Sequence, residues 1–130
     1  MEGLDIVVTA RDYAETLQIL ELEGIPYRPV GKYGGADKVE KLVAYANRAQ
    51  ELVKEIQSKE VHALISLSSP SAIRVAFGLG IPSITLNDTP HAFHVGRLTL
   101  PLSTKVIAPL AVPKNELVKL GAEENKILQY

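Results

Sequence analysis

The chain has 130 residues, which is within the usual size of one domain, so we expect a single hydrophobic core. Its 14 Lys and Arg residues against 15 Asp and Glu residues leave a net charge of -1, which argues against nucleic acid or an anionic membrane as the main partner. The lack of cysteine excludes disulfides and thiolate sites, and no apolar run approaches the roughly 20 residues of a membrane span. We therefore expect a cytoplasmic protein without a transmembrane segment.

The first half of the chain predicts two strand–helix units. Residues 4–9 are a short β-branched run, typical of a strand buried in a parallel sheet. Asp12, with Glu15 three residues later, has the pattern of a capping box and predicts the start of a helix. Residues 27–30 follow as a second strand, and residues 37–58 carry apolar side chains at three- and four-residue spacing, which predicts a long amphipathic helix.

The second half repeats this alternation and brings the total to six strands and five helices. The predicted strands are residues 62–66, 83–86, 105–108 and 126–129, and the predicted helices are residues 70–80, 89–100 and 114–120. Strands that alternate with helices need crossover connections, which are right-handed and place helices on both faces of a parallel sheet. The expected fold class is α/β, with a doubly wound, mainly parallel, Rossmann-like sheet in three layers, α/β/α, over residues 1–130.

Polar side chains gather at the carboxyl ends of the first four predicted strands, where open parallel sheets bind ligands. The candidate binding residues are Arg11, Lys32, Gly34, Gly35, Ser68, Ser69, Ser71, Asn87 and Thr89, and the candidate catalytic residues are Asp88 and His91. Arg97, two helical turns beyond Asp88, is placed to reach a phosphate or to pair with an acid. We predict that these residues line one ligand site.

Two of these loops have a specific chemistry. The serine-rich stretch 66–71 opens a predicted helix, whose first N–H groups and hydroxyls suit a phosphate or a carboxylate, although the same pattern serves plain helix capping. Adjacent glycines at 34 and 35 let the backbone approach a ligand closely, with Lys32 as a charge, or else form a mobile connector. The stretch 31–35 is not a Walker loop, because that motif ends in Gly-Lys-Ser/Thr at a helix start.

Asp88 and His91 lie three residues apart at a predicted strand-to-helix turn. A carboxylate beside an imidazole orients its tautomer and makes a general base, whereas the alternative is a helix cap followed by a solvated histidine. His94 extends the three-residue steps, but ligands at such steps fan around a helix and do not converge on a metal. We expect no metal and no cofactor.

The sequence resembles an uncharacterised archaeal and bacterial family of GT-B-like proteins, related by fold to glycosyltransferases and UDP-N-acetylglucosamine 2-epimerases. The resemblance covers essentially the whole chain, and its segments are Val8-Thr9-Ala10-Arg11-Asp12, Gly24-Ile25-Pro26-Tyr27, Val30-Gly31-Lys32-Tyr33-Gly34-Gly35, Ser69-Pro70-Ser71-Ala72, Ala76-Phe77-Gly78-Leu79-Gly80-Ile81-Pro82-Ser83 and Asn87-Asp88-Thr89-Pro90-His91-Ala92.

The resemblance implies the amino-terminal half of a two-domain protein, in which the facing half binds most of a nucleotide sugar. This half would hold a sugar-containing acceptor or contribute catalytic side chains, and its partner would be a carboxyl-terminal domain or a second copy of the chain. Family members usually begin with one more strand–helix unit. Because that strand would be central, its absence should leave a gap in the sheet.

Two other functions are compatible with the sequence. The chain could be a truncated, non-catalytic domain that binds a partner or a small anionic metabolite through the same helix amino termini. It could also be a small flavodoxin-like or receiver-like domain, although it lacks the acidic cluster and the aromatic loop that such domains use.

Overall fold

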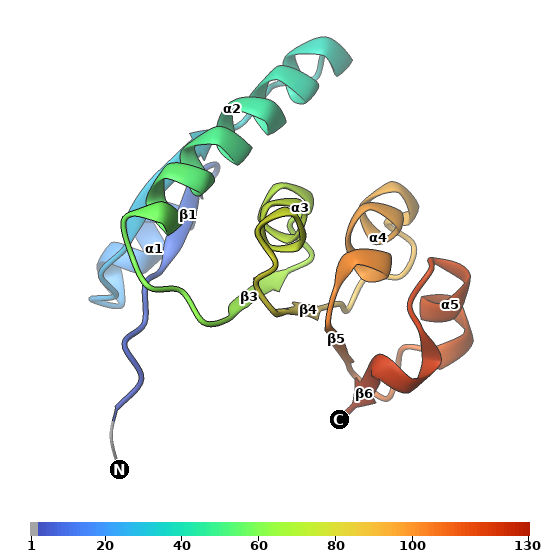
Figure 1. Cartoon of the computed structure of the whole chain (residues 1–130). Helices are drawn as coiled ribbons and strands as arrows, with labels where there is room; N and C mark the ends of the chain where they lie inside the picture. Colours follow the sequence, from blue (N-terminus) through green and yellow to red (C-terminus); the bar gives the residue numbers. More distant parts are fainter. Residues whose placement is uncertain (1–2) are drawn as a thin grey trace. The chain divides into compact units, whose positions relative to one another are not determined.

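Strands and helices alternate along the whole of the described chain, residues 3–130, in the computed structural model (Figure 1). The chain divides into two units, one up to Lys54 and the other Glu55–Tyr130. The first half contains β1 (Thr9–Asp12), α1 (Thr16–Leu22), β2 (Arg28–Lys32) and α2 (Lys38–Gln57). The second half contains β3 (Leu64–Leu67), α3 (Pro70–Leu79), β4 (Ser83–Leu86), α4 (Phe93–Thr99), β5 (Lys105–Ala108), α5 (Lys114–Lys119) and β6 (Ile127–Gln129), with short 3-10 helices at Leu100–Leu102 and Glu124–Lys126.

In the first unit, β1 and β2 form a parallel pair, and the first strand lies further along the chain than predicted. The prediction of a strand at residues 4–9 and of Asp12 as a helix cap was wrong. Asp12 is the last residue of β1, where it is the register partner of Lys32, and its carbonyl accepts a hydrogen bond from Tyr33 N at 3.2 Å. Because the backbone of Asp12 belongs to the strand pair, α1 begins only at Thr16, and no side chain caps it.

The long helix α2 agrees with the prediction for residues 37–58. The Asp37 carboxylate begins it by accepting hydrogen bonds from Val39 N and Glu40 N at 2.9 and 3.0 Å. Its buried side chains are Arg48 and Leu52. The first turns of its apolar stripe are largely exposed, so the helix buries a face rotated from the one that the hydrophobic spacing predicts.

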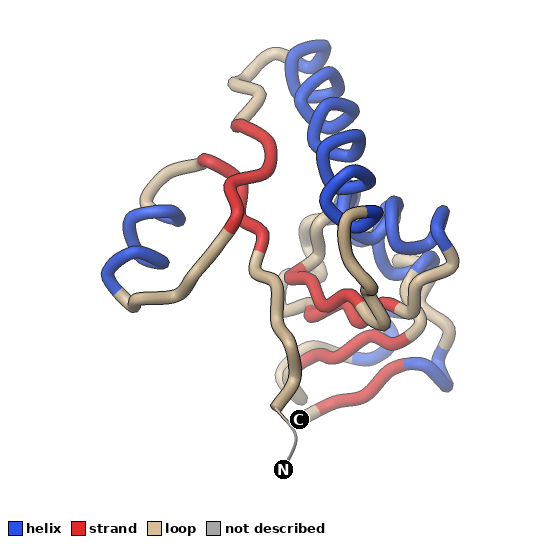
Figure 2. The backbone as a smooth tube through the Cα atoms, turned by 60° about the vertical axis from the view of Figure 1, so that its left-hand side comes forward, coloured by secondary structure: helices blue, strands red, loops and turns tan. Residues whose placement is uncertain are grey.

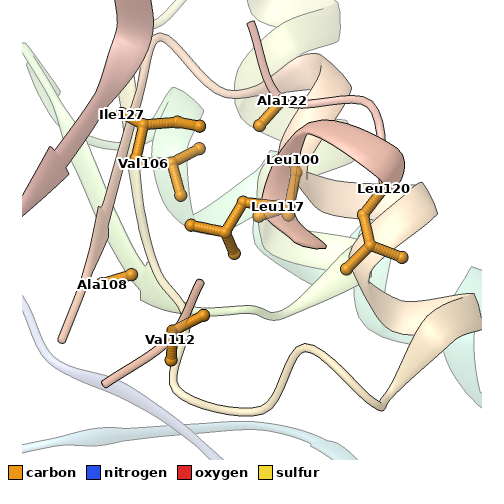
Figure 3. Packing of buried hydrophobic residues seen from close by; sticks show 8 residues of the cluster. All are labelled: Leu100, Val106, Ala108, Val112, Leu117, Leu120, Ala122 and Ile127. Atoms are coloured by element: carbon orange, nitrogen blue, oxygen red, sulfur yellow. The ribbon is translucent and has the colours of Figure 1, made fainter. Parts of the chain in front are cut away.

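In the second unit, four parallel strands lie in the order β3-β4-β5-β6. Each strand pairs with the next strand in the sequence, so α3, α4 and α5 connect neighbours and lie on one face of this sheet (Figures 1 and 2). The apolar core beneath them is shown in Figure 3 and consists of Leu100, Val106, Ala108, Val112, Leu117, Leu120, Ala122 and Ile127.

The other face of the β3–β6 sheet carries a continuous apolar row. Strand register places Leu67 beside Leu86, Leu86 beside Ile107, and Ile107 beside Leu128. Leu67 and Leu128 at the ends of the row are 67% and 52% exposed. Strand β5 is therefore apolar on both faces, whereas β4 has Ser83 and Thr85 on its helix-covered face and Ile84 and Leu86 on the other. The helices of this unit cover one face of the sheet.

The predicted fold class is confirmed: the chain is α/β, with parallel sheets flanked by helices in a Rossmann-like arrangement. Among residues 3–130 the strands form two sheets, β1-β2 and β3-β4-β5-β6, and no strand pairing joins them.

Candidate functional site

The carboxyl ends of β3 and β4 are tied together by a short chain of hydrogen bonds. Ser68, directly after β3, donates its hydroxyl to Leu86 O at 2.9 Å, and Asn87 Nδ2 donates to Ser68 Oγ at 3.0 Å. Ser68 has a φ of 47°, a left-handed conformation that is strained for a residue with a side chain. The strained turn thus places the Ser68 hydroxyl between two loops.

Asn87 is 2% exposed, and its Oδ1 has no hydrogen-bond partner among the described residues. The Ser68 hydroxyl hydrogen is used on Leu86 O, so Ser68 Oγ is an acceptor and the amide must turn Nδ2 toward it. Oδ1 is therefore left as an unpaired acceptor beneath the carboxyl edge of the sheet. A buried amide oxygen without a donor is energetically unfavourable, and such groups are common where a polar molecule binds.

Helix α3 begins at the same edge, with Pro70 as its first residue, as predicted. Ser69 occupies the N-cap position, but its side chain makes no cap bond; its backbone N–H instead donates to Ser66 Oγ at 3.1 Å. Ser69 Oγ lies 3.4 Å from Ser71 Oγ, and Ser71 is buried. Three serine hydroxyls thus surround the amino end of a ten-residue helix, which favours an anionic or hydroxylated ligand.

Asp88, Thr89 and His91 lie in the loop between β4 and α4 and not on a helix, so the prediction of a helix that begins at residue 89 and carries His91 was wrong. The turn made by Ala92 N and Thr89 O, at 3.0 Å, delays the start of α4 to Phe93. All three side chains are exposed, and the structure gives Asp88 and His91 no hydrogen bond or ion pair with each other. Their catalytic role stays a prediction.

Arg97 lies on α4, and its guanidinium sits 5.3 Å from the centre of the Phe93 ring. This contact fixes the side chain against its own helix. His62 precedes β3, at the opposite end of that strand from the carboxyl-end loops; it is exposed, and its Nε2 lies 3.5 Å from Glu60 Oε1.

The remaining candidates, Arg11, Lys32, Gly34 and Gly35, belong to the first unit. A pocket of about 560 Å³ lies at the carboxyl ends of its two strands. The residues that line it are Asp12, Leu17, Pro29, Gly31, Lys32, Ala44, Asn47 and Glu51. Lys32 is the sequence-predicted binding residue that this pocket contains.

Arg48 packs against Gly31, one of the residues that line this pocket. It is 9% exposed, and its Nε donates to Val30 O at 3.0 Å. Burial, with the positive charge of Arg11 nearby, lowers the pKa of Arg48, while the Glu51 carboxylate opposes that shift. Glu51 Oε2 in turn accepts a hydrogen bond from Gly31 N at 2.9 Å, so α2 is joined to the end of β2 by two polar contacts.

The glycines of the 31–35 stretch have structural reasons for their small size. A Cβ at Gly34 would lie 2.8 Å from Glu40 O and from Lys41 Cα, so the loop packs directly on the backbone of α2. Gly35 has a φ of 73°, which a larger residue rarely adopts. Packing at Gly34 and the turn at Gly35 therefore explain both glycines without a ligand.

The exposed rings of Tyr13 and Tyr33 pack against each other beyond the two strand ends. Their centroids are 4.5 Å apart, and the Arg11 guanidinium lies 5.7 Å from the Tyr13 ring. Tyr13 and Tyr33 directly follow the pocket residues Asp12 and Lys32. The contact, together with the hydrogen bond from Tyr33 N to Asp12 O, holds the two strand ends side by side.

Sequence reasoning missed Asn47, Arg48 and Glu51. All three lie within residues 47–51 of α2, a helix whose polar residues look like an ordinary solvent face. The one available signal is the spacing of Arg48 and Leu52, a buried pair four residues apart that marks the packed face.

Within residues 3–130, no group of three or more His, Asp or Glu side chains is placed to hold a metal ion. In that same stretch, no helix combines the length and apolarity that crossing a bilayer requires.

Comparison with known proteins gives a family without an assigned activity. A family profile described as "Protein of unknown function (DUF354)" matches residues 1–130. The "Uncharacterized protein MJ0665" of Methanocaldococcus jannaschii is 35% identical over 120 residues, which is 92% of this chain and 35% of that protein, so the chain spans about a third of the length of this curated relative. No solved structure matches the chain. The chain belongs to the family described as "Protein of unknown function (DUF354)".

Proposed function

We propose that this chain is a GT-B-like domain of a glycosyltransferase or nucleotide-sugar epimerase, and that it contributes the acceptor or catalytic side of a cleft. The observation that carries the proposal is the polar cradle at the ends of β3 and β4. There, buried Asn87 has an unpaired Oδ1 and binds Ser68 through Nδ2, and the hydroxyls of Ser66, Ser69 and Ser71 lie at the start of α3, which follows Ser68 in the chain. Such a cradle suits a ligand with both O–H donors and an anionic group, as a sugar nucleotide or sugar phosphate has.

The roles follow from chemistry. The α3 amino end and the Ser69 and Ser71 hydroxyls would hold the anionic group, and Asn87 Oδ1 would accept a hydrogen bond from a ligand O–H or N–H. Asp88 and His91, in the next loop, would supply the carboxylate and imidazole of a general base once a ligand draws them together, because catalytic hydrogen bonds often form only in the complex. The facing half would come from a further domain or a second copy.

A non-catalytic binding domain is the alternative, and one observation favours it. Asp88 and His91 are both exposed and share no contact, so the general base is not assembled in the ligand-free chain. In this reading the serine cradle binds a small anionic metabolite and performs no proton transfer.

Thermal denaturation with UDP-, GDP- and dTDP-sugars and the free nucleotides tests the proposal, because a ligand that binds only the folded state raises Tm. We expect a saturable rise that Asp88→Ala and His91→Ala weaken. Asp5→Ala and His62→Ala are matched controls, since both residues are exposed and neither lies in the carboxyl-end loops of β3 or β4. A rise that survives both site substitutions supports the non-catalytic alternative. No rise in a cooperatively folding sample refutes nucleotide-sugar binding by this chain.

A further inference from the structure

The first unit holds a second polar pocket, made from residues that the proposed function does not use. Its volume of about 560 Å³ lies within the roughly 300–1,000 Å³ range of pockets that bind small molecules. Asp12, Lys32, Asn47 and Glu51 supply its polar groups, and an apolar wall comes from Leu17, Pro29 and Ala44. A few polar groups in a largely apolar lining are typical of a site for a small molecule.

One of these groups is held in place before any ligand arrives. Glu51 Oε2 accepts the hydrogen bond from Gly31 N, which leaves its second oxygen as an acceptor on a fixed carboxylate. The contact of Gly31 with Arg48 is tight, so the strand end and helix α2 cannot separate without losing packing. A preorganised acceptor binds without the entropic cost of ordering a side chain.

The charged side chains that line the pocket are Asp12, Lys32 and Glu51. Asp12 and Lys32 are register partners at the adjacent ends of β1 and β2. Glu51 lies close enough to buried Arg48 to oppose the lowering of its pKa. With two carboxylates against one ammonium group in its lining, the pocket has no excess of positive charge to attract an anion.

The remaining groups favour hydroxyls. Carboxylates accept from an O–H, the Lys32 ammonium donates to a hydroxyl oxygen, and the Asn47 amide does both. Carboxylate, ammonium and amide groups at one site match a small ligand that bears several hydroxyls.

We infer that this pocket binds a hydroxyl-rich, non-anionic ligand of monosaccharide size through Asp12, Asn47 and Glu51. The inference stands independently of the proposed function, since different residues in a different unit carry it.

The test is a titration of the ¹⁵N-labelled 130-residue chain with glucose, galactose, mannose and N-acetylglucosamine, followed by NMR. At least one of these sugars should shift the amide signals of Gly31, Lys32 and Asn47 saturably. Asn47→Ala and Asp12→Asn should each weaken the affinity by about three- to tenfold, the effect of one or two lost hydrogen bonds. Gln50→Ala, an exposed position on the same helix outside the pocket lining, should leave the affinity unchanged.

Glu51→Gln keeps an acceptor for Gly31 N and should also weaken sugar binding, because the amide replaces a charged acceptor with a neutral one. A dispersed spectrum for each variant shows that it is folded. Inorganic phosphate and UDP are the anionic probes.

The inference is overturned if no sugar gives a saturable shift, or if the two site variants bind as tightly as the parent chain. It is also overturned if phosphate or UDP, and not a sugar, shifts the signals of Gly31 and Asn47. Shifts confined to residues 66–71 and Asn87 would support the proposed function and overturn this inference, so the two can fail separately.

Discussion

Gly31 and Arg48 are in such close contact that a larger residue at position 31 would clash with the Arg48 side chain. A Cβ at Gly31 would lie 2.8–2.9 Å from the Cβ, Cγ and Cδ atoms of Arg48, and Gly31 has a φ of 78°. The aliphatic stem of Arg48 therefore lies against the backbone of β2, while its guanidinium binds Val30 O one residue away.

Gly31→Ala should destabilise the first unit more than Gly24→Ala. Both glycines have a positive φ, but a Cβ at Gly24 would meet nothing within 4 Å. Gly24→Ala should cost about 1 kcal/mol from backbone strain alone, and Gly31→Ala about 1–3 kcal/mol more from the clash. Urea unfolding followed by circular dichroism measures both. Equal losses would mean that Arg48 swings away freely and does not pack as described.

Ser68→Ala should cost about 1–3 kcal/mol, because it leaves the buried Asn87 amide and Leu86 O without their partner. Ser68→Gly removes the same hydroxyl but also relieves the left-handed strain at this position, so it should be the milder change. Chemical denaturation of the two variants gives the comparison. The hydrogen-bond chain is contradicted if Ser68→Ala unfolds at the same denaturant concentration as the parent.

The buried hydroxyls under β4 should respond unequally to removal. Ser103 Oγ donates to Thr99 O at 2.8 Å, so Thr85 Oγ1, 2.5 Å from Ser103 Oγ, must be the donor in their contact. Ser103→Ala should cost about 1–3 kcal/mol because it leaves the fully buried Thr85 hydroxyl unpaired, whereas Thr85→Val should cost less than about 1 kcal/mol.

Ser83→Ala is the matched control for Ser103→Ala. Ser83 is also buried, but its hydroxyl has no hydrogen-bond partner among the described residues. Its removal should be neutral or stabilising, since nothing is left unpaired. Calorimetric Tm values rank the three variants, and an order with Ser83→Ala as the worst would refute this hydrogen-bond assignment.

The apolar row on the helix-free face should tolerate polar substitution in this chain. Leu67→Thr should change the unfolding free energy by less than about 0.5 kcal/mol, because the side chain is mostly exposed and threonine suits a strand. Leu117→Ala, in the fully buried core, should cost about 2–5 kcal/mol. A large loss for Leu67→Thr would show that this side chain is covered in solution, and sedimentation of the parent chain would then reveal self-association.

Local sequence signals predicted the second unit well. Residues 83–86 and 105–108 are strands with the predicted bounds, and Pro70 and Gly80 bracket α3 as expected from their fixed or left-handed backbone. The first strand was misplaced because β1 is set by its pairing and its irregularity between Ala10 and Asp12, which no local pattern records.

The candidate site was predicted in part for a related reason. The serine loop and Asn87 follow strands directly, so the rule for parallel sheets finds them. The pocket residues Asn47 and Glu51 lie at least 15 positions after Lys32, the last residue of β2. Their place in the pocket depends on how α2 packs on β2. The loop position of Asp88 and His91 was missed because the Thr89–Ala92 turn imitates a helix start in sequence.

The order β3-β4-β5-β6 has a consequence for how the second unit folds. Every strand pairs with its sequence neighbour, and the paired residues, such as Leu64 with Ser83 and Val106 with Ile127, are only about 20 positions apart, which is a low contact order for a parallel sheet. Any one strand–helix–strand module can therefore form first and be extended in either direction, much as in a repeat protein. Amide hydrogen exchange should then be slowest in β4 and β5, which have neighbours on both sides, and fastest in β3 and β6.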